Sequence, residues 1–326
     1  MQLKVVISDY SWPSIDIEKK FFKKNNINLE VASSDDDLIN KIKDADGLLF
    51  CFSEINENVL RSATKLRVAQ RYGIGVDNID IKVANELGIV VSNIPDYCID
   101  EVSDHALSMI LALNRMIIPD SRMVKLGKWN DVKKNNRVYR LKDATLGVIG
   151  FGRIGRRLSH KAKSLGLNVI AYDPYISEKV YDGVNILSFD EVISQSDILS
   201  LHVPLTEETK HLISHNEFKK MKKDVILINV SRGGLIDEAA LSLFLDKGKV
   251  RGVGLDEIED HSDDSFNPLF KFENVIITPH TAFFSQESTQ ELQNRACEQL
   301  LLSLNGHKPE YFINPEVMNH DKVNLS

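Results

Sequence analysis

The chain has 326 residues, of which 43% are hydrophobic and 27% charged. These values exclude a disordered or fibrous protein, and the length predicts two domains. A formal net charge of −7 argues against a protein that binds nucleic acid or an anionic membrane, because such proteins usually carry a basic patch.

Short apolar runs alternate with helical patterns through roughly the first hundred residues. Helical patterns cover Ile15–Lys24 and Asp35–Lys43. The sequence predicts strands at Leu3–Ile7, Ile27–Ala32, Gly47–Phe52, Val68–Gln70 and Ile89–Ser92. Strands that alternate with helices in this way indicate a parallel sheet with helices on both faces.

The same alternation begins again further along the chain. A strong helix is predicted over Glu101–Asn114, and the polar stretch from Lys125 to Asp143 is expected to have loops at its ends. Further strands are predicted at Leu146–Ile149, Val169–Tyr172, Ile198–His202, Val225–Asn229, Val250–Leu255 and Val275–Thr278. A long helix, Gln286–Leu304, follows and could cross back to the first unit. The fold class is therefore α/β, with two doubly wound parallel sheets.

The compartment of the protein is predicted from its apolar segments and its cysteines. No run of about 18 apolar residues is present, which predicts no membrane span. The amino-terminal apolar stretch is too short for a signal peptide. Cys51, Cys98 and Cys297 are far apart and have no metal-ligand spacing. An odd number of cysteines without a secretory signal predicts reduced thiols in the cytoplasm and no metal site.

A glycine-rich turn follows the predicted strand Leu146–Ile149. Gly150, Gly152 and Gly155 fit the pattern GxGxxG, with Arg153 and Ile154 inside it, and a helix is expected from Arg156 to Leu165. The first glycine permits a tight turn, the second permits close approach of a pyrophosphate, and the third permits close packing of helix and strand. Free N–H groups at the start of the helix would then face the phosphates. The turn predicts a dinucleotide site.

An acidic residue completes this pattern. Asp173 lies 18 residues beyond Gly155, at the end of the predicted strand Val169–Tyr172. A carboxylate there would accept hydrogen bonds from the ribose hydroxyls and repel a 2′-phosphate. No arginine adjoins Asp173, so the sequence predicts NAD in preference to NADP.

Several further motifs occur in order and carry a family resemblance. They are His202–Thr206 (HVPLT), Asn229–Gly234 (NVSRGG), Gly254–Asp256 (GLD), Thr278–His280 (TPH) and, upstream, Arg71–Asp80 (RYGIGVDNID). Together they resemble the D-isomer-specific 2-hydroxyacid dehydrogenases almost from end to end. The Arg71 segment and His280–Ser285 are most similar to the branch with the C-terminal-binding proteins and phosphoglycerate dehydrogenase-like bacterial enzymes.

The resemblance implies a domain organisation. A Rossmann NAD-binding domain, residues 100–288, would be inserted into a flavodoxin-like substrate domain formed by residues 1–99 and 289–326. The active site would lie in the cleft, and a homodimer would form largely through the inserted domain. We thus expect one discontinuous domain rather than two consecutive halves.

The same resemblance supplies candidate catalytic residues. Arg232 would bind the substrate carboxylate and polarise its carbonyl, which the planar fork of a guanidinium suits. His280 would exchange the proton, because imidazole titrates near neutral pH. Both positions follow predicted strands, at the edge where open α/β sheets bind ligands.

Other positions match the cofactor and substrate sites of the family. Asp256 would hydrogen-bond the nicotinamide carboxamide, and the cofactor would also be lined by Val203, Pro204, Val230 and Ala282. For the substrate, Ile74 and Gly75 lie in a loop whose N–H groups could bind a carboxylate. Arg71 is either a second cation for the substrate or an exposed arginine at a strand end. Phe283 either faces the substrate side chain or packs in the core.

The family pattern breaks at one position. Its members usually place a glutamate, followed by proline, five residues after Asp256, and this glutamate pairs with the catalytic histidine. Here that position is His261, and the proline is missing. Three alternatives follow: a shifted Glu259 or Asp260 is the partner, which we favour; His261 replaces the glutamate; or His280 acts alone. An imidazolium beside His280 would lower its pKa, whereas a carboxylate would raise it.

The sequence therefore predicts an NAD-dependent oxidoreductase that interconverts a small anionic 2-keto acid and its D-2-hydroxy acid. Hydroxypyruvate, glyoxylate and branched keto acids all remain candidates. The chain ends soon after its last helix, which disfavours a longer, serine-regulated phosphoglycerate dehydrogenase. The alternative is an NADH-sensing dimeric binding protein with little turnover, which the similarity to C-terminal-binding proteins allows.

Overall fold

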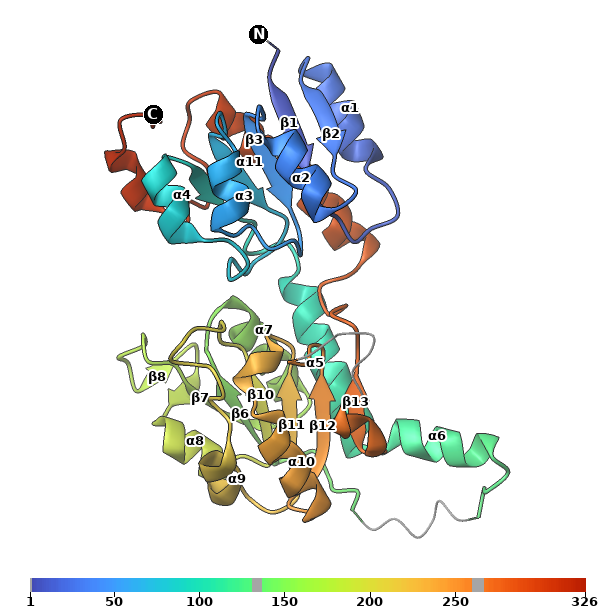
Figure 1. Ribbon diagram of the computed structural model, residues 1–326. Helices are drawn as coiled ribbons and strands as arrows, with labels where there is room; N and C mark the ends of the chain where they lie inside the picture. The colour runs from blue at the N-terminus through green and yellow to red at the C-terminus, as the bar shows by residue number, and fades with distance from the viewer. Residues whose placement is uncertain (1, 131–136, 260–266) are drawn as a thin grey trace. The chain divides into compact units, whose positions relative to one another are not determined.

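The computed structural model describes residues 2–130, 137–259 and 267–326. The chain forms two compact units, one containing residues 1–98 and 284–326 and the other residues 99–283. The first unit is thus discontinuous, and the second is inserted into it (Figure 1). The return to the first unit comes just before the last helix, a few residues earlier than the boundary expected at 288/289.

The first unit is built on a five-stranded parallel sheet of order β2-β1-β3-β4-β5. This is the strand order of flavodoxin. The strands are β1 (Lys4–Ile7), β2 (Asn28–Val31), β3 (Gly47–Phe50), β4 (Val68–Arg71) and β5 (Val90–Ser92). Four of them, β1, β3, β4 and β5, are almost wholly buried, as a sheet covered on both faces requires.

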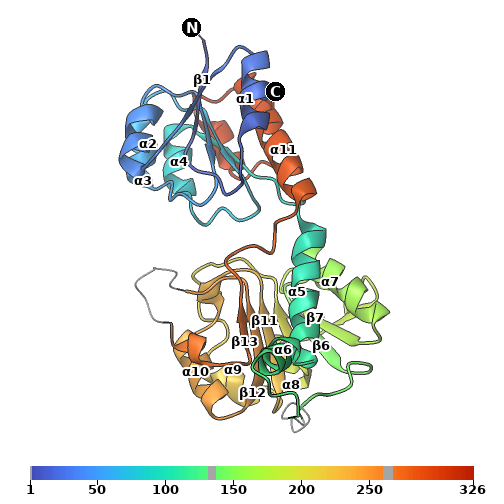
Figure 2. The same cartoon turned by 90° about the vertical axis from the view of Figure 1, so that its right-hand side faces the viewer.

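Helices cover both faces of this sheet (Figure 2). One face carries α2 (Asp35–Ile42), α3 (Glu57–Ser62) and α4 (Ile81–Leu87), whose apolar side chains share a core with alternate residues of the strands. The other carries α1 (Asp16–Lys24) and α11 (Gln286–Leu304), which pack against each other. The carboxyl-terminal helix α11 therefore completes the core of the first unit.

The inserted unit contains an eight-stranded sheet of order β13-β12-β11-β10-β6-β7-β9-β8. All neighbouring strands are parallel except β8 and β9, which form an antiparallel hairpin. The strands are β6 (Thr145–Ile149), β7 (Asn168–Tyr172), β8 (Val180–Tyr181), β9 (Val184–Ile186), β10 (Ile198–Leu201), β11 (Val225–Asn229), β12 (Val250–Leu255) and β13 (Val275–Ile277). The strand order reverses between β6 and β10, where doubly wound sheets bind ligands.

Helices lie on both faces of this second sheet as well. One face carries α5 (Ile99–Asn114) and α7 (Arg153–Ser164), which contact each other. The other carries α8 (Phe189–Gln195), α9 (His215–Lys220) and α10 (Glu238–Asp246), whose apolar side chains join one large core. The predicted class, two doubly wound α/β sheets, is confirmed.

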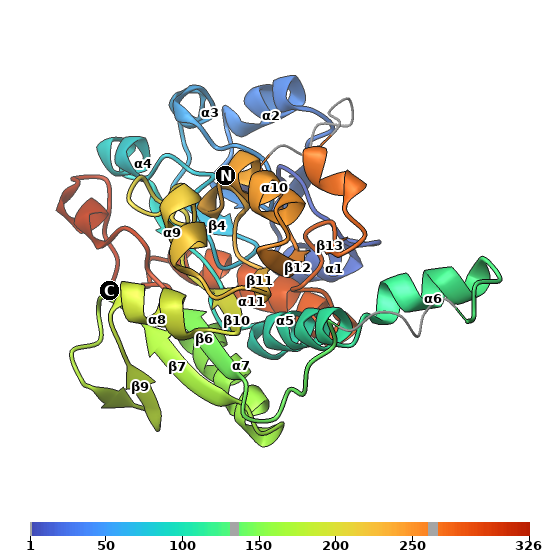
Figure 3. The same ribbon diagram turned by 90° about the horizontal axis from the view of Figure 1, so that it is seen from below.

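The helix α6 (Ile117–Lys125) has no buried residue and projects from the inserted unit (Figure 3). No helix was predicted there from the sequence. Among the described residues, no helix is both long and apolar enough to cross a membrane.

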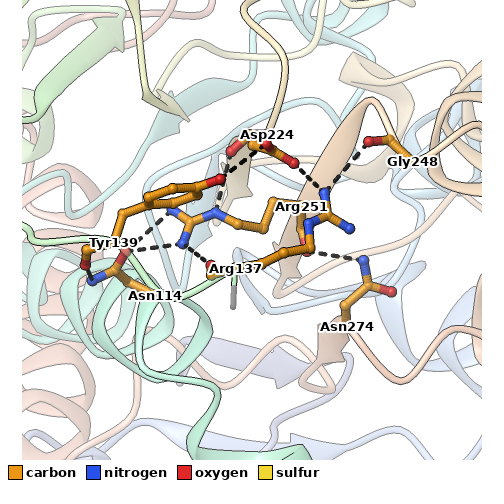
Figure 4. A network of polar contacts seen from close by, with 7 residues as sticks. All are labelled: Asn114, Arg137, Tyr139, Asp224, Gly248, Arg251 and Asn274. Carbon is orange, nitrogen blue, oxygen red and sulfur yellow. Dashed lines mark hydrogen bonds and ion pairs between the residues drawn. The ribbon is translucent and has the colours of Figure 1, made fainter. Parts of the chain in front are cut away.

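A polar network closes the amino-terminal edge of the inserted sheet (Figure 4). The buried guanidinium of Arg251, on β12, donates to Asn114 Oδ1 at 3.1 and 3.2 Å, to Arg137 O at 2.9 Å and to Asp224 O at 3.2 Å. It also lies 4.8 Å from the ring centre of Tyr139. The network thus fastens the segment before β6 to the sheet, at the edge opposite the carboxyl ends of its strands.

Candidate active site

The glycine-rich turn connects β6 to α7. Gly150 has a φ of +90°, and a Cβ there would lie 2.5 Å from the carbonyl oxygen of His202, so only glycine fits. A Cβ on Gly155 would lie 2.3 Å from the carbonyl oxygen of Gly150, whereas one on Gly152 would meet nothing within 4 Å. The first and third glycines therefore close the turn, and the second leaves open space where a phosphate would approach.

The helix after this turn begins earlier than expected. It starts at Arg153 rather than Arg156, so that Gly155 lies within its first turn. The helix can begin there because Gly155, without a side chain, fits against the Gly150 carbonyl. Its first N–H groups therefore belong to the glycine-rich turn itself, which is the arrangement that binds phosphate at a helix start. Arg153 is exposed there, and Ile154 is half-buried.

Asp173 follows β7 directly and is half-buried. Its Oδ2 accepts the N–H of Phe151 at 2.9 Å, and its Oδ1 accepts that of Tyr175 at 3.0 Å. The carboxylate is therefore held beside the glycine-rich turn. The open space at Gly152, the helix start and this fixed carboxylate together fit a nicotinamide dinucleotide.

Four other expected cofactor contacts lie on loops that follow strands. Val203 and Pro204 come after β10, and Val230 comes after β11. Ala282 is buried and follows β13. All of them therefore lie on the edge of the sheet where the glycine-rich turn begins.

Asp256, at the end of β12, organises the loop that carries His280. Its Oδ1 accepts the hydroxyl of Thr278 at 2.5 Å and the N–H of Thr281 at 2.9 Å, and its Oδ2 accepts the N–H of Ala282 at 2.8 Å. Its side chain is 2% exposed. A residue expected only to contact the cofactor thus also fixes the adjacent loop.

His280 stands in a strained turn. Its φ is +50°, a left-handed conformation that is uncommon for a residue with a side chain. The turn is held because the His280 N–H donates to Asp256 O at 2.8 Å and to Thr278 O at 3.0 Å. The imidazole is one-third exposed, and the ring of Phe283 lies edge-on to it at 6.1 Å. Phe283 therefore lies beside the candidate acid–base group.

Arg232 follows β11 and is largely buried. Asn229 Nδ2 donates to its carbonyl at 2.7 Å, and its own Nη1 donates to Ser231 O at 2.8 Å. Nη1 lies 3.6 Å from Oε2 of Glu257, and Nδ1 of His280 lies 3.5 Å from the same oxygen. The structure therefore brings Arg232 and His280 together around one carboxylate, that of Glu257.

Glu257 was not among the candidate residues predicted from the sequence, and the favoured partner of His280 was a shifted Glu259 or Asp260. The Glu259 carboxylate instead pairs with His211, at 3.0 Å from its Nε2. Asp260, the other acid of the favoured alternative, and His261, the residue of the second alternative, lie outside the described residues. Glu257 could have been considered, because it is an acid that adjoins Asp256. The spacing of the family instead places the glutamate four residues after Glu257.

The remaining expected substrate residues lie in the first unit. Arg71 is not the exposed arginine that one alternative supposed, because it is 5% exposed. Its Nε donates to Gly75 O at 3.1 Å, and its Nη1 donates to Tyr72 O. Gly73 has a φ of +145°, and Asn93 Nδ2 donates to Ile74 O at 2.7 Å. Arg71 therefore shapes the loop that contains Ile74 and Gly75.

Comparison with known proteins agrees with this geometry. Residues 107–282 match the family model described as "D-isomer specific 2-hydroxyacid dehydrogenase, NAD binding domain". The chain belongs to this family. It is similar to a glyoxylate reductase of Korarchaeum cryptofilum, with 35% identity over 286 residues that cover 86% of each chain.

The chain is also similar to two other dehydrogenases. A D-3-phosphoglycerate dehydrogenase of Methanocaldococcus jannaschii is 38% identical over 301 residues, which are 90% of this chain but 57% of that protein. The chain thus spans little more than half of that relative. The crystal structure of an Aquifex aeolicus D-lactate dehydrogenase with NAD and lactic acid superposes with a TM-score of 0.84 and 28% identity, and the match covers 93% of this chain and 96% of that one.

Proposed function

We propose that the protein interconverts a short 2-keto acid and its D-2-hydroxy acid with NAD. The observation that carries this proposal is the convergence of Arg232 and His280 on the Glu257 carboxylate, 3.6 and 3.5 Å from one oxygen. A guanidinium and an imidazole in this arrangement can polarise a carbonyl and exchange a proton with its oxygen. The relatives named above are dehydrogenases and reductases, which favours the enzyme over the sensing protein.

Each residue of the site would have its own role in this reaction. A bound nicotinamide would supply or accept the hydride. Arg232 would hold the substrate carboxylate and carbonyl oxygen, and the N–H groups around Ile74 and Gly75 would add donors for the carboxylate. His280 would give its proton to the oxygen in reduction and take it back in oxidation. Phe283, beside His280, would favour a small or apolar substituent on the acid.

Asp173 supports NAD in preference to NADP. Its carboxylate is fixed by two backbone N–H groups, and it would meet the 2′-phosphate of NADP with like charge. The buried thiols support a reducing compartment, and we propose the cytoplasm. Burial raises the pKa of Cys51 to about 11, and it also raises that of Cys297, so neither thiol ionises near neutral pH.

The decisive experiment follows NADH oxidation with a panel of 2-keto acids. Glyoxylate comes first, since a similar relative is named a glyoxylate reductase, and pyruvate, hydroxypyruvate and branched keto acids follow. We expect turnover with at least one acid, less with NADPH, and a loss of at least about 100-fold in Arg232→Ala. Tight NADH binding without turnover on any acid would favour the sensing protein instead.

We further propose a homodimer formed through the inserted unit. Apolar side chains are exposed along α6 and just beyond it: Ile117 is 55% exposed, Ile118 49%, Leu126 60% and Trp129 67%. A projecting helix with this surface is typical of an interface with a second copy. We expect light scattering to give a dimer mass, and the double variant Ile118→Glu/Leu126→Glu to give a monomer. A monomeric wild-type protein would contradict the proposal.

A further inference from the structure

We propose that Glu257 is the positioning carboxylate of His280, at a place in the chain where the spacing of the family does not put it. This inference rests on the proposed function, because it assigns the partner of the proposed acid–base residue. The family's glutamate comes five residues after the position of Asp256, whereas Glu257 comes directly after it.

The contacts of Glu257 identify it as this partner. Its side chain is 15% exposed, and its Oε2 lies 3.5 Å from Nδ1 of His280. At this distance the carboxylate forms an ion pair with a protonated imidazole, and it leaves the other nitrogen, Nε2, to face a substrate. The same oxygen lies 3.6 Å from Nη1 of Arg232. Glu257 therefore links the two residues that would act on one carbonyl group.

The backbone around Glu257 is firmly anchored, so its direction is fixed by the fold. Asp256, before it, donates its N–H to Asn229 O at 2.9 Å, and Ile258, after it, is 8% exposed and belongs to the core. A Cβ on Gly233 would lie 2.2 Å from the carbonyl carbon of Ile258. This close packing holds the Ile258–Glu259 peptide against the start of the turn that follows Arg232.

The neighbouring acid points to a different partner. The Glu259 N–H donates to Glu238 Oε1 at 2.8 Å, and the Glu259 carboxylate pairs with His211. The two glutamates are separated by one residue, yet each faces its own histidine. Glu259 is therefore a matched comparison: it has the same charge, lies in the same loop and is not directed at His280.

The charges around His280 determine the expected effect. Among the described residues of the inserted unit, Glu257 faces its Nδ1, Arg232 faces Glu257, and the ring of Phe283 lies beside the imidazole. The Asp256 carboxylate accepts the donors of residues 278–282 instead. In reduction the imidazolium gives one proton to the substrate oxygen and becomes neutral, while Glu257 stays ionised. Glu257 stabilises the imidazolium, and Arg232 partly offsets this effect.

The test compares pH profiles of kcat/KM for reduction in Glu257→Gln and Glu259→Gln. Loss of the Glu257 charge lowers the pKa of His280, so we expect the alkaline limb to move about one unit toward lower pH. At pH 7.5 we expect a loss of about 10-fold in kcat, with the KM for NADH unchanged. Glu259→Gln should keep the wild-type limb, and Glu257→Asp should recover part of the shift.

A second measurement does not depend on turnover. The imidazole of His280 is titrated by NMR in wild-type protein and in Glu257→Gln, with His280→Gln to assign the signal and circular dichroism to verify folding. We expect the His280 pKa to fall by about one unit in Glu257→Gln. An unchanged pKa, or a shift in His261→Ala or Glu259→Gln instead, overturns the proposal. Absence of turnover in the wild type would refute the proposed function. The NMR titration of His280 would then still test whether Glu257 is its partner.

Discussion

The buried guanidinium of Arg251 offers a quantitative test of what stabilises the inserted unit. Arg251→Leu removes the donors to Asn114 Oδ1, Arg137 O and Asp224 O. Asn114 is 2% exposed, so its oxygen loses its partner out of reach of water. An unsatisfied buried acceptor costs about 1–3 kcal/mol. Water can reach the other two acceptors more easily, because Arg137 and Asp224 are half-buried residues.

The expected total is about 3–4 kcal/mol, because the variant leaves the buried Asn114 oxygen without its donor and also removes charge-assisted hydrogen bonds to two backbone carbonyls. Burial lowers the pKa of Arg251, so desolvation disfavours its charge in the folded state. In a unit of this size about 1 kcal/mol shifts Tm by 2–4 °C, so the transition of the inserted unit should fall by about 10 °C.

Differential scanning calorimetry of the full chain measures this shift. Arg137→Leu is the matched control, because Arg137 pairs with the partly exposed Asp224, and it should cost less than about 1 kcal/mol. Arg251→Lys keeps the charge but loses the planar fork and should fall between the two. A Tm of Arg251→Leu within 2 °C of the wild type, or an equal loss in Arg137→Leu, would refute the reasoning.

Three further outcomes are expected. Asp173→Ala should weaken NADH binding by about 10–100-fold and NADPH binding much less, as measured by fluorescence titration; equal losses would contradict the role of Asp173. Gly233→Ala should cost about 1–3 kcal/mol and lower kcat, because its Cβ would meet the Ile258 backbone. In Gly234→Ala the Cβ would meet only the end of a leucine side chain, so a loss as large as that of Gly233→Ala would argue against a backbone clash. Burial raises the pKa of Glu18 in the folded state. The folded state therefore loses stability as pH rises above the pKa that Glu18 has in the unfolded chain. Urea unfolding should show that Glu18→Gln becomes more stable relative to the wild type from pH 4 to 8. A constant difference across this range would show that Glu18 titrates alike in both states.

The sequence predicted the features that depend on local pattern. Both doubly wound sheets follow from the alternation of apolar runs and helical segments, and the family follows from motifs in a fixed order. The hairpin of β8 and β9 was not predicted, although Asp182 and Gly183 between the two strands are a typical turn pair. Both residues have positive φ in the structure. This turn pair did not lead to a predicted hairpin, because the two strands beside it are short and have little apolar pattern.

Other features could not be predicted because they depend on which way a side chain points. Arg71 is the last residue of β4 and could be exposed there, yet its guanidinium donates back to the loop after the strand. Glu257 and Glu259 are both glutamates and nearly adjacent, but the packing of Ile258 against Gly233 directs them to different histidines. The helix α6 buries no residue, so it has no core-facing stripe by which periodicity could reveal it.

The discontinuity of the first unit has a consequence for how the protein is made. The sheet β1–β5 emerges first from the ribosome, but its second face is completed only by α11. Leu300 of α11 lies so near Gly47 that a Cβ there would be 3.2 Å from it, and Gln293 Nε2 donates to Ser14 O and Glu18 Oε2. The inserted unit carries all of its own strands and is synthesised in full before α11. During translation the domain that begins second can therefore fold first, while one face of the amino-terminal sheet is covered by α1 alone until α11 is made.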